Sequence, residues 1–137
     1  MKAEVIEQAL ILSNNYRRVT DQILRERLGI TYAKFLILVQ INEGHNTSNI
    51  ISKNLGKTEA SISRQIAMLE KELIIKRKNN RTDDRVKVIA LTKKGALVLK
   101  NCNKVIDGYF NNKISKINKK DEIIKTLKTI NKDMTKL

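Results

Sequence analysis

The sequence has no proline and no tryptophan, and it has only one cysteine, five glycines and few aromatic residues. Because proline breaks helix interiors, its absence from 137 residues favours uninterrupted helices joined by short polar turns. With aromatic residues at 4% of the chain, the core must consist mainly of Ile and Leu. We expect a mainly helical chain with one modest core.

Several classes of protein are disfavoured by what is missing. A lone cysteine, Cys102, allows no disulfide within the chain and points to a reducing cytosol. No apolar run approaches the length of a membrane span, and the N-terminal segment lacks the pattern of a signal peptide. His45, in a predicted turn, forms no metal-binding or catalytic set with the distant Cys102, and the glycines form no phosphate-binding loop. We therefore expect no metal, no cofactor, no membrane contact and no enzyme.

Positive charge is in large excess. The chain has 28 Lys and Arg against 14 Asp and Glu, a formal net charge of +14. Such a balance favours binding to nucleic acid, to an acidic membrane surface or to an acidic protein, in that order. A solvated basic surface without a partner is the alternative, so the placement of the charge along the chain must decide.

Helical patterns follow one another through the first half of the sequence. Apolar residues recur at helical spacing over residues 3–27, and Thr31 can cap a second helix whose apolar run from Phe35 to Val39 is expected in the core. Thr47 opens a short third helix that ends at Gly56. Thr58 caps a fourth that reaches about Leu73. The last two, joined by a tight turn, are typical of a DNA-binding helix-turn-helix.

A β-hairpin and two helices complete the pattern. Residues 74–78 and 85–91 read as strands joined by a polar turn, Thr92 caps a helix to about residue 113, and residues 120–136 form the last helix. The predicted fold is mainly α with a small hairpin wing (α+β), in a single domain over residues 1–137 whose winged helix-turn-helix covers about residues 31–91.

Short motifs along residues 29–99 resemble those of the MarR family of winged helix-turn-helix transcription regulators. They are Gly29-Ile30-Thr31 with Phe35, Leu55-Gly56, Ser61-Ile62-Ser63-Arg64 followed by Leu69-Glu70-Lys71, Asp83-x-Arg85, and Leu91-Thr92-x-x-Gly95. The resemblance implies a homodimer, built from the first, fifth and sixth helices, that reads a pseudo-palindromic operator. Most family members have glycine where this chain has Leu73, so the fourth helix should end in a different cap or run slightly longer.

The resemblance also implies a pocket for a small-molecule effector between the dimerisation helices and the winged helix. The aromatic residues available to line it are Tyr16, Tyr32, Phe35 and Tyr109, although each could equally serve in packing. Some relatives sense oxidants through a cysteine of the first helix. Cys102 does not match that position, and we interpret it as a small buried apolar side chain, with thiol sensing as the alternative.

Two sets of residues are candidates for contact with double-stranded DNA. In the recognition helix they are Thr58, Glu59, Ala60, Ser61, Ser63, Arg64 and Gln65, because the start of such a helix reaches base edges in the major groove. In the wing they are Lys76, Arg77, Lys78, Arg81, Arg85 and Lys87, and an arginine at the wing tip suits the narrow minor groove of A·T tracts. The alternatives are an ordinary solvated helix face and a charged strand edge that prevents aggregation.

The sequence therefore predicts a cytoplasmic, nucleoid-associated DNA-binding regulator, with a repressor expected over an activator. A ligand-independent global regulator or chromatin-like protein is the alternative within DNA binding, favoured by the high charge. A winged helix that binds an acidic protein is the alternative of another class, and the absence of salt-dependent DNA binding would favour it.

The acids of the wing generate a first prediction. Asp83 is two residues from Arg85 and can orient its guanidinium by a charge-assisted hydrogen bond, which reduces the entropy lost when the arginine is fixed in a groove. Asp84 points to the other side if the strand geometry extends that far. In DNA titrations at matched salt, we expect Asp83→Ala to weaken operator binding and Asp84→Ala to leave it equal or slightly tighter. Tighter binding by Asp83→Ala would contradict the orienting role.

Overall fold

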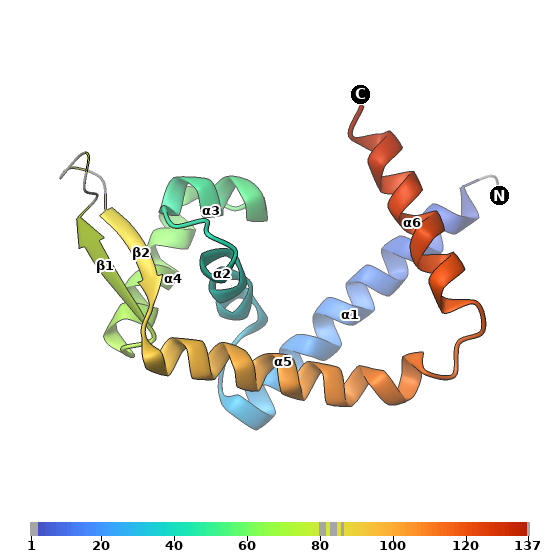
Figure 1. Cartoon of the computed structure of the whole chain (residues 1–137), viewed down its shortest axis with the longest axis horizontal. Coiled ribbons are helices and arrows are strands. Elements are labelled where there is room, and N and C mark those ends of the chain that lie inside the picture. Colours follow the sequence, from blue (N-terminus) through green and yellow to red (C-terminus); the bar gives the residue numbers. More distant parts are fainter. Residues whose placement is uncertain (1–2, 80–81, 83–84, 86, 137) are drawn as a thin grey trace. The chain divides into compact units, whose positions relative to one another are not determined.

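The computed structural model describes residues 3–79, 82, 85 and 87–136, and the chain divides into two compact units, residues 1–106 and residues 107–137. The first unit contains α1 (Glu4–Leu28), α2 (Tyr32–Asn42), α3 (Ser48–Leu55), α4 (Glu59–Lys71), the strands β1 (Ile75–Asn79) and β2 (Lys87–Leu91), and the first part of α5 (Lys93–Ile114) (Figure 1). The second contains the rest of α5 and α6 (Lys120–Met134). The predicted fold class, mainly helical with a hairpin wing, is confirmed. The single domain over residues 1–137 stays a prediction.

Threonine caps begin four of the helices, as the sequence predicted. The hydroxyl oxygen of each accepts a hydrogen bond from the backbone N–H three residues later, which satisfies a donor that has no partner within the helix. The pairs are Thr31 with Lys34 at 3.1 Å, Thr47 with Ile50 at 3.3 Å, Thr58 with Ser61 at 3.1 Å and Thr92 with Gly95 at 3.0 Å. The caps at Thr47 and Thr58 fix the starts of α3 and α4, the two helices of the helix-turn-helix.

The core of the first unit is aliphatic, as the lack of aromatic residues predicted. The side chains of α2 form its centre, since Ile37 and Leu38 have no exposed surface and Phe35 is nearly covered. Every helix and strand of this unit adds to the core, with Leu24, Ile51, Ile66, Leu69, Ile75, Ile89 and Leu99 all buried. The predicted role of α2 as the centre of the core is confirmed.

The wing is an antiparallel hairpin that packs beside α4 (Figure 1). Ile75 pairs with Leu91, Arg77 with Ile89, and Asn79 with Lys87, so these residues share one face of the hairpin. Ile89 also donates its N–H to the carbonyl of Asn46, at 2.8 Å, just before the cap of α3. The wing is thereby joined to the start of the helix-turn-helix by a backbone hydrogen bond.

The recognition helix α4 ends in a cap that normally contains glycine. Leu73 has φ of 61°, in the left-handed region, and its N–H donates to Glu70 O at 3.0 Å while the N–H of Ile74 donates to Leu69 O at 3.0 Å. This pair of bonds is the Schellman motif, and the buried Ile74 and Leu69 supply the apolar residues that usually accompany it. The expectation of a different cap or a longer helix is therefore wrong: the backbone keeps the cap that glycine usually forms, and Leu73 adopts its left-handed conformation at a cost in strain.

The start of α5 is pressed against the chain that leaves α4. Thr92 donates its N–H to Ile74 O at 3.1 Å, and its hydroxyl lies 2.6 Å from Leu73 O. Gly95 lies so close that a Cβ added there would be 1.9 Å from Ile74 O, whereas a Cβ on Gly108 would meet no atom within 4 Å. The motif Leu91-Thr92-x-x-Gly95 is therefore a packing requirement of this junction.

These two glycines of α5 make a matched pair for a stability test. We expect Gly95→Ala to lower the free energy of unfolding by about 2–3 kcal/mol or more, because the methyl group must displace a backbone carbonyl. Gly108→Ala should raise it by up to about 1 kcal/mol, because alanine is the better helix former. Urea denaturation at one protein concentration measures both. Equal stability of the two variants would contradict the close approach at residue 95.

Candidate nucleic-acid interface

The helix-turn-helix is closed by a three-residue turn between α3 and α4. Gly56, with φ of 64°, adopts the left-handed conformation that ends α3, and Lys57 donates its N–H to Ser52 O at 2.9 Å. Thr58 then caps α4. Thr58, Glu59 and Ala60 are exposed, so the start of the recognition helix is open to solvent.

The recognition helix has one buried and one accessible face. Ile62, Ile66 and Leu69 are buried, whereas the accessible stripe recurs every three or four residues and comprises Glu59, Ala60, the partly covered Ser63, Arg64, Ala67, Met68 and Lys71. Among the candidates named from the sequence, Ser61 and Gln65 lie at the borders of this stripe, partly covered. The Oε1 atom of Gln65 is buried and has no hydrogen-bond partner in the described part of the chain. Lys71 lies two turns beyond Arg64, and helical spacing alone could have added it to the candidates.

Glu59 is held by the helix before it. Its Oε1 accepts a hydrogen bond from Ser48 Oγ at 3.5 Å and its Oε2 accepts one from Asn49 Nδ2 at 3.4 Å. Both donors belong to the first turn of α3, where the positive end of the helix dipole also favours a carboxylate. Ser48 and Asn49 were not among the residues predicted from the sequence, because a contact over ten residues leaves no local pattern.

The cations of the wing are divided between its two faces. Arg77 and Lys87 share the face of the buried Ile89, and Lys76 and Lys78 lie on the other. The Nε atom of Arg77 is 3.5 Å from Glu70 Oε2 on α4, and Lys87 donates to Asn79. Arg85 is exposed in the turn before β2, whereas Arg81, Asp83 and Asp84 lie outside the described residues.

A small cavity joins the recognition helix to the wing. It has a volume of about 40 Å³, room for a water molecule, and is lined by Ser48, Ser63, Ile66, Arg77, Lys87 and Ile89. Two cations of the wing thus lie beside the hydroxyls of α3 and α4. Of the residues predicted from the two separate motifs, the structure brings Ser63 of the recognition helix together with Arg77 and Lys87 of the wing at this cavity.

A second, larger cavity of about 630 Å³ lies in the first unit. Its lining combines charged, polar, aromatic and apolar side chains from α1, α2, the end of α3 and the turn before α4, namely Asn14, Arg17, Arg18, Asp21, Tyr32, Ala33, Leu36, Leu55 and Lys57. Burial raises the pKa of the Tyr32 phenol above its ordinary value, the neighbouring Tyr16 adds to the shift and Arg17 opposes it.

The aromatic residues predicted for an effector pocket are only partly gathered there. Tyr16 packs edge-on against Tyr32, with ring centroids 6.2 Å apart. Phe35 is a buried core residue whose ring centroid lies 6.1 Å from that of Tyr32. Tyr109 belongs to the second unit, where it packs against Phe110 at 4.9 Å and lies 4.2 Å below Lys113 Nζ. Of the four, only Tyr32 lines the cavity.

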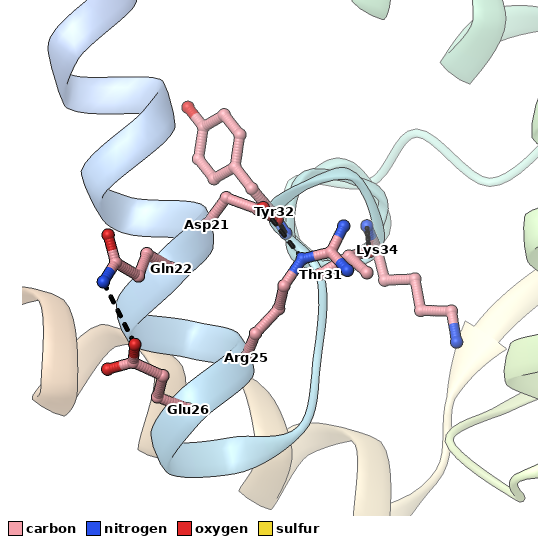
Figure 2. Close-up of polar contacts among 7 residues, drawn as sticks. All are labelled: Asp21, Gln22, Arg25, Glu26, Thr31, Tyr32 and Lys34. Atoms are coloured by element: carbon pink, nitrogen blue, oxygen red, sulfur yellow. Dashed lines mark hydrogen bonds and ion pairs between the residues drawn. The ribbon is translucent and has the colours of Figure 1, made fainter.

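One carboxylate of the cavity wall anchors the start of α2. Figure 2 shows Asp21 between Arg25 and the first turn of α2. Its Oδ2 is 2.8 Å from Arg25 Nε, and its Oδ1 accepts the N–H of Tyr32 at 2.9 Å. Tyr32 is therefore fixed through its backbone as well as through its ring.

Cys102 is part of the core, and His45 follows α2. Cys102 is fully buried, and burial raises the pKa of its thiol to about 11, so the thiol is protonated at neutral pH. His45 donates its N–H to Gln40 O in the turn after α2. In the ranges that the structure describes, no three His, Cys, Asp or Glu residues are grouped as metal ligands, and no helix is long and apolar enough to span a membrane.

A capped helix-turn-helix with an exposed recognition stripe, flanked by a basic hairpin, defines a winged-helix DNA-binding protein. The family described as Transcriptional regulator SarA/Rot matches residues 19–102, which is more than half of the chain. The chain belongs to this family of winged-helix regulators, which is related to MarR. No curated protein matches the sequence.

Solved structures of MarR-type regulators share the fold. The transcriptional regulator BldR from Sulfolobus solfataricus has a TM-score of 0.82 at 20% identity, covering 99% of this chain and 96% of its own. MarR from E. coli, in its apo form, has 0.77 at 22%, covering 93% and 94%. MepR from S. aureus, in a complex with DNA, has 0.73 at 21%, also covering 93% and 94%. The predicted resemblance to the MarR family is confirmed at the level of the fold.

Proposed function

We propose that this regulator binds a specific double-stranded DNA sequence as a homodimer and represses transcription from that site in the cytoplasm. The observation that carries the proposal is the accessible stripe of α4 beside the basic wing face. Its small residues, Ala60 and Ser63, let the helix approach base edges, and Arg64 can reach guanine or phosphate. MepR, a protein of this fold, has been solved in a complex with DNA, which supports DNA as the partner.

The wing is proposed to contact the DNA backbone and the adjacent minor groove. Arg77 and Lys87 flank the recognition helix at the small cavity, while Arg85 is in the turn that precedes β2. Contacts to phosphate position a protein without reading sequence, and arginine in a narrow minor groove reads its width. Base identity is therefore assigned to α4, and shape to the wing.

A homodimer is supported by apolar residues that the chain leaves exposed. In the first half of α1, Val5, Leu10 and Leu12 are each more than 60% exposed. The second unit has Ile123, Ile124 and Leu127 on one face of α6, all exposed. Apolar surface of this extent normally marks an interface. Two recognition helices related by a two-fold axis would read a pseudo-palindromic operator with half-sites one helical turn apart.

Release by a small-molecule effector is proposed for the larger cavity. Leu55 and Lys57 connect its wall to the turn before α4, and Asp21 connects it to the start of α2. A ligand held there would act on both helices that position the recognition helix. Its aromatic and basic lining favours an amphipathic anion.

The high net charge favours a second candidate function, that of a chromatin-like protein that binds DNA with little sequence preference. The two functions differ in what Arg64 does. In a specific regulator Arg64→Ala should weaken binding to an enriched operator by about 1–3 kcal/mol and change binding to random DNA much less. Arg27→Ala, an equal change of charge at the end of α1, is the control. Fluorescence titration of both variants at one salt concentration measures the difference. Equal losses on operator and random DNA would favour the chromatin-like protein.

The dimer is testable without DNA. Sedimentation should show a dimer at micromolar concentration, and Leu10→Glu should shift it towards monomer because a charge would be buried in the proposed interface. Met68→Glu places the same charge on an exposed residue of α4 and should leave the dimer intact. A monomeric wild-type protein at this concentration would contradict the proposed homodimer.

A further inference from the structure

An acid at the start of a recognition helix is unexpected on a surface meant for DNA. Glu59 is the first residue of α4, it is exposed, and the chain has a net charge of +14. Near phosphate its carboxylate lowers affinity for every DNA sequence. Either it serves only to join α4 to α3, or it contributes something that outweighs this repulsion.

The contacts of Glu59 orient its carboxylate and leave both oxygens able to accept further hydrogen bonds. Ser48 Oγ and Asn49 Nδ2 each donate to a different oxygen, at 3.5 and 3.4 Å. A carboxylate can accept about four hydrogen bonds, so both oxygens keep acceptor capacity. Because the side chain is already oriented by α3, less rotamer entropy is lost when a further donor binds.

The chemistry of the carboxylate then selects the base. Glu59 can only accept hydrogen bonds, and in the major groove cytosine offers its N4 amino group while guanine offers two acceptors. We propose that Glu59 is a specificity-determining residue that accepts a hydrogen bond from a cytosine in each half-site, with Ser48 and Asn49 as its positioning residues. This inference rests on the proposed function and adds the identity of one base.

The test is selection from duplexes with a randomised centre, by the full-length protein and by Glu59→Gln. Wild type should enrich cytosine at one position of each half-site. Glutamine can pair with adenine N6 and N7, so the variant should lose that preference and favour adenine at the same position only. On the duplex enriched by wild type, Glu59→Gln should bind about 5- to 100-fold more weakly. On random duplex it should bind about threefold more tightly, because one repulsive charge is gone.

Two controls separate base reading from structure. Glu43→Gln makes the same change of charge at the end of α2 and should enrich the wild-type sequence. Asn49→Ala keeps the carboxylate but loosens it, so it should retain cytosine with reduced preference. Thermal unfolding confirms that each variant is folded.

The outcomes distinguish a failure of the cytosine contact from a failure of the proposed function. If wild type enriches a sequence and Glu59→Gln enriches the same bases at every position, Glu59 joins two helices and reads nothing, and this inference fails while the proposed function stands. A wild-type protein that enriches no sequence would overturn both.

Discussion

The contact between the carbonyl of Ile74 and the start of α5 fixes three elements at once. The left-handed Leu73 ends α4, and Ile74 leads into β1. At the start of α5, Thr92 donates hydrogen bonds to the carbonyls of Leu73 and Ile74, and Gly95 packs against the carbonyl of Ile74. Because the β1–β2 register follows from this closure, a displacement of one residue would turn the wing over. The recognition helix and the wing can form one surface only while this contact holds.

Two carboxylates of α4 and its C-terminal end hold basic side chains of the wing and of α2. Glu70 holds Arg77 of the wing, and Glu72 holds Lys34 of α2 at 3.1 Å while its carbonyl accepts from Lys94 at 2.8 Å. Two lysines thus lie at the C-terminus of α4, where the helix dipole favours cations. The Arg77–Glu70 pair is exposed on both sides, and pairs of this kind contribute little to stability.

Local patterns predicted most of the fold, and long-range contacts account for what they missed. Threonine caps and aliphatic spacing depend on neighbours within a few residues, so the helices and the core could be read from the sequence. The division of wing cations between two faces follows from the pairing of Arg77 with Ile89, and the contacts of Glu59 and Asp21 join residues about ten positions apart. Grouping aromatic residues by type placed Tyr109 with Tyr32, although the two belong to different units.

The salt dependence of binding to two duplexes of equal length tests the central claim, that this surface reads DNA sequence. One duplex carries the sequence enriched by the protein and the other carries the same bases in scrambled order. The account predicts that both affinities fall as salt rises, because phosphate contacts release counterions, and that the enriched duplex binds about a thousandfold more tightly at physiological salt. Equal affinity for the two duplexes across the salt range would contradict it.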